Sequence, residues 1–299
     1  MMTLNNLKPR LPDIIIRENW PLFPLSTLGT GGKAEFFAQP ETVPQLQEIV
    51  RAAENTPVYV LGGGSNILIP DGVIHGLVIS TRNLNSISWL DDRTAEIGAG
   101  FSLPVLVKTL REKNIGGLEF SAGIPGTLGG AIMGNAGAGG HGVCEFAESL
   151  NAVDAQGNLV ALGRDDFSYG YRNCTLRGVI IASVVMSWSG GTSWDEAKYS
   201  EFMAKRKNQP IGMRSAGCTF KNPEGHSAGK LLDDCGCKGL RIGGAFVSDV
   251  HANFILNGGN ATSSDIIELA DLCAKRVCES TGITLEPEIK TLSPCFSVK

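Results

Sequence analysis

The chain has 299 residues and a net charge of −4, with acidic and basic side chains evenly mixed. This balance excludes a chain-wide basic footprint for nucleic acid or an anionic membrane, and the length favours two or three domains over one. Glycine is abundant, at 38 residues, whereas aromatic residues are few. We therefore expect ligands to meet exposed backbone more often than stacked rings.

The eight cysteines are scattered, without the spacing of a disulfide framework or of two zinc-ligand pairs. The N-terminus has no apolar core of signal-peptide length, and no apolar run is long enough for a membrane span. We expect a cytoplasmic protein with reduced thiols and no metal. We also expect no nucleic-acid, membrane or evident protein partner.

The first glycine cluster, Gly29 to Ala34, matches a dinucleotide fingerprint but lacks its context. Pro21 and Pro24 precede it, and a strand-like segment at 35–38 follows where the fingerprint requires a helix. We interpret its glycines as a turn.

The second glycine cluster follows a predicted helix at 42–54, capped by Thr42, and a predicted strand at 58–61. It consists of Gly62, Gly63, Gly64, Ser65 and Asn66. A phosphate-binding P-loop would need a following helix and a Lys-Ser or Lys-Thr pair, and both are missing. The turn is instead suited to holding a diphosphate with its amides, with a tight hairpin turn as the alternative.

The third cluster, Gly117 to Gly140, reads GLEFSAGIPGTLGGAIMGNAGAGG. A flexible linker would be rich in serine and polar residues, whereas these glycines are interleaved with apolar side chains such as Leu118, Ile124 and Leu128. The pattern predicts short buried segments joined by tight turns, which present amides to a phosphate or a flat ring. We interpret this stretch as a wall of a cofactor site.

The rest of the chain predicts an α+β protein in three parts, 1–78, 79–194 and 195–299. The middle part carries expected strands at 77–80, 93–98, 148–153, 159–162 and 179–188, and a helix capped by Ser102. The last part carries a helix that ends in a basic run before Pro210, strands at 241–247 and 253–256, a helix at 263–280 capped by Thr262, and a final strand at 283–289.

Three polar clusters are candidates for chemistry. Arg172 follows Tyr171 in a setting suited to gripping a carboxylate, although a surface arginine has the same pattern. Cys218 stands between a glycine and a segment that offers Lys221 and Asn222, although most lone cysteines are packing residues. Glu286-Pro287-Glu288 would ordinarily be a surface acidic pair.

These segments together resemble the flavin-dependent UDP-N-acetylenolpyruvoylglucosamine reductases of bacterial peptidoglycan synthesis. The resemblance runs from LSTLGTGG at 25–32 through GGGSN at 62–66 and GIPGTLGGA at 123–131 to the three polar clusters. SAGKLL at 227–232 and the segment 239–244 also look like parts of that family. Several of these segments are long and stand in the family's order.

The resemblance implies an oxidase-type, two-domain FAD fold with a C-terminal α+β substrate domain. FAD and NADPH would be the cofactors, and UDP-N-acetylglucosamine enolpyruvate would be reduced to UDP-N-acetylmuramate. The implied FAD contacts are Gly62, Gly63, Gly64, Ser65, Asn66, Gly123, Ile124, Pro125, Gly126, Gly130, Asn135, Ala136 and Gly137. The implied substrate contacts are Tyr171, Lys221 and Asn222, with Arg214 or the basic run from Lys205 for the diphosphate.

The resemblance also implies a role for each polar cluster. Arg172 would bind the substrate carboxylate and stabilise charge that develops there. Glu288 would orient or polarise the enolpyruvyl group from the opposite side. Cys218 would donate the proton, at a position where most members carry serine, and a thiol is a stronger acid than a hydroxyl.

A second departure from the family is length. Little chain separates Arg172 from Gln209, so the tyrosine-bearing insertion of longer members is absent, and the sequence resembles the short form. Two alternatives are open. One is an FAD-dependent alcohol or hydroxyacid oxidase on the same fold, for which neither His75 nor His141 lies in a covalent flavin motif. The other is a colourless, non-catalytic UDP-sugar-binding protein.

Overall fold

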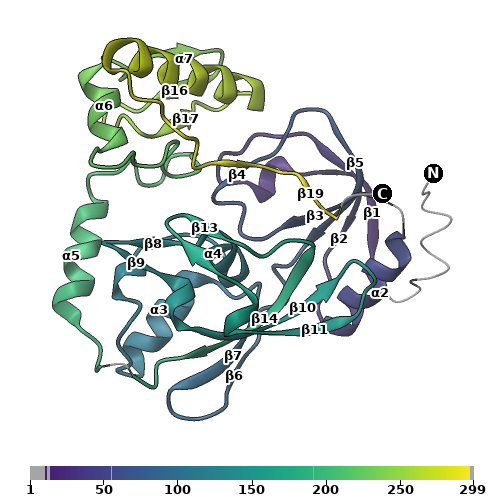
Figure 1. Ribbon diagram of the computed structural model, residues 1–299. Helices are drawn as coiled ribbons and strands as arrows, with labels where there is room; N and C mark the ends of the chain where they lie inside the picture. The colour runs from purple at the N-terminus through teal and green to yellow at the C-terminus, as the bar shows by residue number, and fades with distance from the viewer. Residues whose placement is uncertain (1–10, 12–13, 55, 191, 297–299) are drawn as a thin grey trace.

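The computed structural model describes residue 11 and residues 14–54, 56–190 and 192–296. Figure 1 shows a purple N-terminal unit, a teal central unit, and a green-to-yellow C-terminal unit that stands above the other two. Helices and strands are mixed throughout, as the α+β prediction requires. We propose that the three predicted parts meet near residues 78 and 194, because one strand ends at Ser80 and a helix begins at Glu196.

The N-terminal unit is built on a five-stranded sheet in the order β1 (Ile16–Pro21), β2 (Lys33–Ala38), β5 (Val73–Ser80), β3 (Val58–Leu61) and β19 (Pro294–Phe296). β2 and β3 run parallel to β5, whereas β1 and β19 pair antiparallel at the two edges. The predicted helix is α2 (Val43–Ala53), and Thr42 caps it by accepting a hydrogen bond from Gln45 N at 3.3 Å.

The central unit contains an antiparallel sheet in the order β11 (Leu159–Gly163), β10 (Ala147–Asp154), β14 (Val179–Ser187), β7 (Thr94–Gly98) and β6 (Ile87–Trp89). The predicted hairpin between β10 and β11 is confirmed. Helices α3 (Leu103–Glu112) and α4 (Leu128–Gly134) bury Leu106 and Ile132 in one core with Ile97 and Val184 of the sheet. Ser102 precedes α3 at the expected position, but its side chain makes no capping bond to this helix.

The sheets of the two units are joined through α2. Ile49 of α2 lies in a single buried cluster with Ile79 of the first sheet and with Val153 and Ile180 of the second. The two sheets therefore share a core, which fixes the loops at their ends relative to each other.

The glycine-rich stretch from Gly117 to Gly140 is packed, as predicted. It forms a short 3-10 turn at Glu119–Ser121, helix α4, and strand β8 (Gly137–Ala138), which pairs with β9 (His141–Gly142). The sequence did not predict α4, because glycine is a poor helix former and supplies three of its seven residues. Packing explains one of them, since a Cβ on Gly129 would lie 2.8 Å from Ala99 Cβ.

The C-terminal unit has a three-stranded antiparallel sheet, β15 (Arg241–Ile242), β16 (Ala245–Val247) and β17 (Ile255–Asn257), with helices α6 (Ala228–Asp234) and α7 (Ser263–Thr281). Helix α7 is the predicted one. Thr262 and Asp265 cap each other's backbone at 3.0 Å and 2.9 Å, and Gly282 ends the helix at φ 74°. Such a cap contributes about 1 kcal/mol to stability.

Polar contacts tie the C-terminal unit to the N-terminal one. The Asp71 carboxylate accepts hydrogen bonds from the backbone N–H groups of Ser263 and Ser264, at 3.0 Å and 2.9 Å, at the start of α7. On the other side, Asn257 Nδ2 donates to Leu28 O at 2.8 Å. These bonds hold the C-terminal unit over the loops of the first sheet.

The predicted final strand at 283–289 is wrong. That segment makes one isolated bridge, and the chain then forms β18 (Lys290–Thr291), which pairs in parallel with β4 (Ile67–Leu68), and β19. The reason is Pro287, which lacks an N–H group and so interrupts a ladder. Figure 1 shows β19, in yellow, entering the purple unit.

None of the described helices is long and apolar enough to cross a bilayer. Within the described part of the chain, no group of three or more His, Cys, Asp or Glu side chains is arranged to hold a metal ion. All eight cysteines are free.

Candidate active site

The loop that carries Cys218 and the segment that carries Glu288 lie side by side. Phe220 and Pro287 form an antiparallel bridge, and Glu288 N donates a hydrogen bond to Thr219 O at 2.8 Å. Two segments almost seventy residues apart in sequence are thereby fixed in register. The sequence placed Glu288 on a terminal strand, whereas the structure places it directly beside the cysteine loop.

Arg172 reaches the same point from the central unit. It lies in the tight connection between β12 (Tyr169–Gly170) and β13 (Asn173–Cys174), at φ 55°, a backbone conformation that costs about 1 kcal/mol or more for a non-glycine residue. Its Nη1 donates to Gly137 O at 2.8 Å, and its Nε lies 2.6 Å from Glu288 Oε1. The side chains are only 23% and 15% exposed, so this ion pair is largely removed from water.

The electrostatics of this point favour protonated forms. Burial raises the pKa of Cys218 to about 11, with Glu288 adding to the rise and Arg172 and Arg206 opposing it. Burial also raises the pKa of Glu288 above its ordinary value, although the positive charge of Arg172 acts against the shift. Cys218 is therefore a thiol at neutral pH, with a proton available to give.

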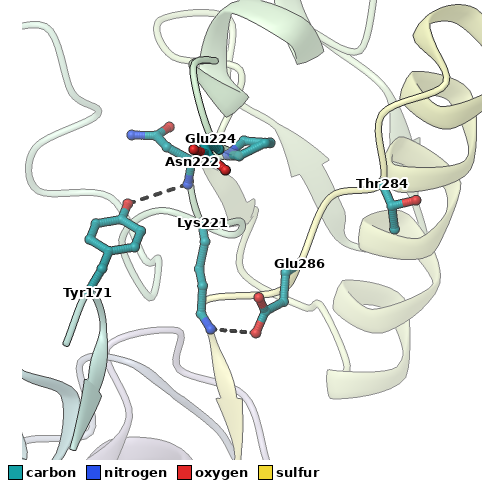
Figure 2. A pocket seen from close by; sticks show the side chains of 7 residues that line it. Tyr171, Lys221, Asn222, Glu224, Thr284 and Glu286 are labelled. Atoms are coloured by element: carbon teal, nitrogen blue, oxygen red, sulfur yellow. Dashed lines mark hydrogen bonds and ion pairs between the residues drawn. The ribbon is translucent and has the colours of Figure 1, made fainter. Parts of the chain in front are cut away.

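A pocket of about 290 Å³ opens next to these residues, between the central and C-terminal units. Figure 2 shows Tyr171 pointing at it from one side and Lys221 and Glu286 pointing at each other across it. Lys221 Nζ and Glu286 form an ion pair, and Tyr171 Oη accepts a hydrogen bond from Asn222 N at 3.4 Å. The structure therefore brings three of the four predicted substrate contacts to one pocket.

The fourth, Arg214, lies elsewhere. Its exposed side chain packs against the N-terminal unit, where a Cβ on Gly29 would lie 3.0 Å from Arg214 Cδ. A different arginine, Arg206 at the end of α5 (Glu196–Arg206), is closer to the site. Its Nε donates to Ala122 O at 2.7 Å, burial lowers its pKa, and Cys218 is within its electrostatic reach. The sequence singled out the basic run at this helix end but not Arg206 within it.

The two glycine-rich walls touch each other. A Cβ on Gly62 would lie 2.7 Å from Thr127 Oγ1, and one on Gly63 would lie 2.6 Å from Gly126 Cα. Gly64 is at φ 65°, with a Cβ position only 1.9 Å from Leu25 O. Side chains are thus excluded where the two segments meet.

Other predicted cofactor residues make hydrogen bonds within the protein that the sequence did not reveal. Asn66 Nδ2 donates to Glu288 O at 3.2 Å, which ties the second glycine cluster to the backbone of Glu288. Asn135, at φ 39°, donates from Nδ2 to Gly170 O at 2.9 Å, two residues before Arg172. The neighbouring Ala136 and Gly137 lead into β8, and Gly137 O accepts from Arg172.

Two parts of the chain match known protein families. Residues 34–163 match the FAD binding domain family, and residues 209–292 match the family described as UDP-N-acetylenolpyruvoylglucosamine reductase, C-terminal domain. The UDP-N-acetylenolpyruvoylglucosamine reductase of Geotalea uraniireducens is 39% identical over 92% of this chain and 93% of its own. That of Anaplasma marginale is 40% identical over 88% of both chains.

The chain belongs to the UDP-N-acetylenolpyruvoylglucosamine reductase family. A solved structure agrees: the crystal structure of the reductase from Thermus caldophilus is 33% identical, covers 93% of this chain and 98% of its own, and superposes with a TM-score of 0.78. Both glycine-rich walls lie inside the segment that matches the FAD binding domain.

The residues at the walls fit FAD. The hydroxyls of Ser80, Ser121 and Thr127 are buried and have no hydrogen-bond partner among the described residues. Buried polar groups are normally satisfied, so unpaired hydroxyls point to a polar ligand that completes them. The Thr127 hydroxyl lies next to Gly62, 2.7 Å from the position of a Cβ there. These hydroxyls and the glycine backbone can pair with the polar atoms of FAD.

Arg82 supports the glycine turn at Gly62 to Asn66, and sequence reasoning missed it. Its Nε donates to Gly62 O at 3.0 Å, and its Nη2 donates to Leu25 O at 2.7 Å and Gly63 O at 2.9 Å. Because these carbonyls face the guanidinium, the backbone N–H groups of the glycine turn can face the opposite side. No local pattern marks this arginine, because its partners lie about twenty and fifty-seven residues away.

Proposed function

We propose that this protein reduces UDP-N-acetylglucosamine enolpyruvate to UDP-N-acetylmuramate for peptidoglycan synthesis, as an FAD-dependent oxidoreductase that uses NADPH. The observation that carries the proposal is the meeting of Arg172, Cys218 and Glu288 beside the two glycine-rich walls. A carboxylate-binding cation, a protonated thiol and a buried acid are the groups that reduction of an enolpyruvyl ether requires. The turn from Gly62 to Asn66 and the segment from Gly123 to Gly137 would hold FAD, which when bound would supply the hydride for the methylene carbon, with NADPH as the reductant.

The residues of this chain supply the rest. Arg172 exchanges part of its contact with Glu288 for the substrate carboxylate and stabilises negative charge on the adjacent carbon. Cys218 gives its thiol proton to that carbon, so the ether gains one hydride and one proton, and the thiolate regains a proton from solvent. Glu288 lies opposite and orients the enolpyruvyl group.

We infer that the pocket lined by Tyr171, Lys221 and Asn222 receives the nucleotide-sugar part of the substrate. Lys221 is paired with Glu286, so an incoming diphosphate would compete with that carboxylate for the ammonium. Arg206 is better placed than Arg214 to add positive charge next to Cys218. The short chain between Arg172 and Gln209 leaves this pocket open toward solvent rather than under an insertion.

We further infer that the enzyme acts in the cytoplasm, because eight free cysteines suit a reducing compartment.

The test is a visible spectrum of the purified protein under anaerobic conditions. The protein should be yellow, NADPH should bleach it, and the enolpyruvyl sugar should restore the colour. Failure to bleach would remove the reductase assignment. Restoration by oxygen together with peroxide formation from an alcohol, but not by the sugar, would favour an oxidase.

A further inference from the structure

Asn253, a buried residue of the C-terminal unit, holds the two residues that follow Cys218. It lies before β17 and is 3% exposed. Its Oδ1 accepts from Phe220 N at 2.9 Å, and its Nδ2 donates to Phe220 O at 2.8 Å. Its own carbonyl accepts from Thr219 N at 2.8 Å. Three hydrogen bonds thus fix the backbone immediately after the thiol.

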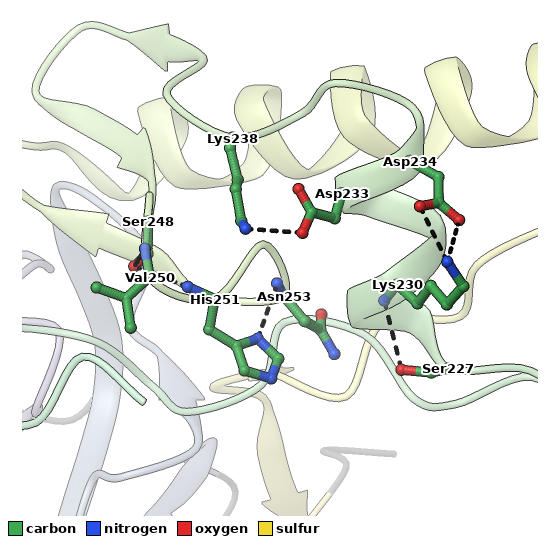
Figure 3. A network of polar contacts seen from close by, with 9 residues as sticks. All are labelled: Ser227, Lys230, Asp233, Asp234, Lys238, Ser248, Val250, His251 and Asn253. Carbon is green, nitrogen blue, oxygen red and sulfur yellow. Dashed lines mark hydrogen bonds and ion pairs between the residues drawn. The ribbon is translucent and has the colours of Figure 1, made fainter. Parts of the chain in front are cut away.

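Asn253 is itself fixed from behind, as Figure 3 shows. Its N–H donates to His251 Nδ1 at 3.2 Å, and the N–H of His251 donates to Ser248 Oγ at 3.3 Å. The imidazole packs edge-on against Phe254, with ring centroids 5.0 Å apart. It also fills the space beside Gly229, where a Cβ would lie 2.8 Å from His251 Cε1.

The same short segment also holds Glu288 in place by a backbone hydrogen bond. Thr219 O accepts from Glu288 N at 2.8 Å, and Thr219 Oγ1 accepts from Ile255 N at 3.3 Å. On the other side of the thiol, Gly217 is at φ 79° with open space where a Cβ would stand. The direction of the Cys218 side chain is therefore set from its C-terminal side, by Thr219 and Phe220.

We propose that Asn253 is a positioning residue that aims the Cys218 thiol by clamping Thr219 and Phe220. It acts through Cys218 and touches neither substrate nor cofactor. The inference rests on the proposed role of Cys218 as proton donor. It predicts that Asn253 affects proton delivery to the substrate and leaves reduction of the flavin alone, because reduction by NADPH does not use the thiol.

The experiment compares Asn253→Ser with Asn257→Ser in the full-length holoenzyme. Asn257 is a matched control: it is 5% exposed, lies four residues later, and also uses both side-chain atoms in buried hydrogen bonds, but to Leu28, Gly259 and Ala261 rather than to the cysteine loop. Stopped-flow absorbance measures bleaching by NADPH and reoxidation by the enolpyruvyl sugar separately. FAD content and thermal midpoint are measured for both variants.

For Asn253→Ser, we expect bleaching within about twofold of wild type and reoxidation slowed by about 10- to 100-fold, since a misplacement of about 1 Å can have that effect. For Asn257→Ser we expect both half-reactions within about twofold. Equal slowing of both half-reactions in Asn253→Ser, or the same pattern in both variants, would overturn the proposal. If Asn253→Ser does not accumulate, Asn253→Asp takes its place, because aspartate keeps the shape and the acceptor for Phe220 N.

A double-mutant cycle separates aiming from general support. In a Cys218→Ala background, Asn253→Ser should add no further slowing of reoxidation, because there is no thiol left to aim. Additive slowing would contradict the proposal. If Cys218→Ala alone reoxidises at the wild-type rate, the proton-donor role has failed, and that outcome is distinguishable because it is seen with Asn253 intact.

Discussion

Replacement of Glu288 by glutamine should separate what this residue does for the reaction from what it does for the fold. Burial raises the pKa of Glu288, so the folded protein holds its proton more tightly than the unfolded chain does. Its contribution to stability is therefore full at low pH and falls as pH rises through the folded pKa. Above that pKa, the ionised carboxylate is a cost to the fold.

Glutamine removes that cost and keeps an oxygen for Arg172, whose Nε lies 2.6 Å from Glu288 Oε1 in the wild-type protein. Exchanging a charge-assisted bond for a neutral acceptor loses about 1 kcal/mol. The two effects oppose each other, so the free energy of unfolding of Glu288→Gln should stay within about 1 kcal/mol of wild type at pH 8. At pH 5 the variant should be less stable relative to wild type than it is at pH 8. Glu288→Ala instead leaves Arg172 unpaired in a mostly buried site and should cost about 3–5 kcal/mol.

Activity should respond differently. Loss of one preorganised electrostatic group typically slows the chemical step by about 10²–10³, or about 2.7–4 kcal/mol. We expect this slowing in flavin reoxidation by the enolpyruvyl sugar, while bleaching by NADPH changes little. Stopped-flow absorbance and thermal unfolding at both pH values measure the two effects. A Glu288→Gln protein as unstable as Glu288→Ala, or one that reoxidises at the wild-type rate, would refute the reasoning.

Three other substitutions test other parts of the structure. Cys218→Ser should retain reoxidation, and Cys218→Ala should reduce it to a slow residual rate with bleaching intact. Because the wild-type pKa is about 11, wild-type reoxidation should show no loss from this group up to pH 9. Gly64→Ala should lower FAD content and destabilise by about 1–3 kcal/mol or more, since its Cβ would lie 1.9 Å from Leu25 O; FAD retention at the wild-type level would contradict this. Burial opposes ionisation of Asp71, but hydrogen bonds from the start of α7 hold its pKa below the usual value. Because this side chain is exposed and solvent screens it, Asp71→Asn should destabilise by only about 0.5–1 kcal/mol at pH 7 in chemical unfolding, and this difference should shrink as pH falls through that pKa.

The sequence predicted what depends on local pattern. Caps such as Thr42 and Thr262, the hairpin after Asp154, and the exclusion of a helix after Gly62 to Asn66 all follow from residues that are neighbours in the chain. Helix α4 was missed because glycine supplies three of its seven residues, and the close packing of one of them, Gly129, against Ala99 is not visible in helix propensity.

The candidate site was predicted in part, because family resemblance named its residues while their support depends on distant contacts. Nothing near Asn253 in sequence indicates that it holds Phe220, and nothing near Arg82 indicates that it holds Gly62. The resemblance named Arg214, or the basic run from Lys205, for the diphosphate, yet the Arg214 side chain lies against Gly29. Contacts between residues far apart in the sequence position these three side chains.

The pairing of β19 with β3 has a consequence for folding. Val58 faces Phe296, and Ile67 faces Lys290, so the first sheet and the turn between β3 and β4 are completed by residues more than two hundred positions later in the chain. Closing a loop of this length is slow compared with forming the local helices. We therefore expect one edge of the first sheet, and the flavin site beside it, to be completed late in folding.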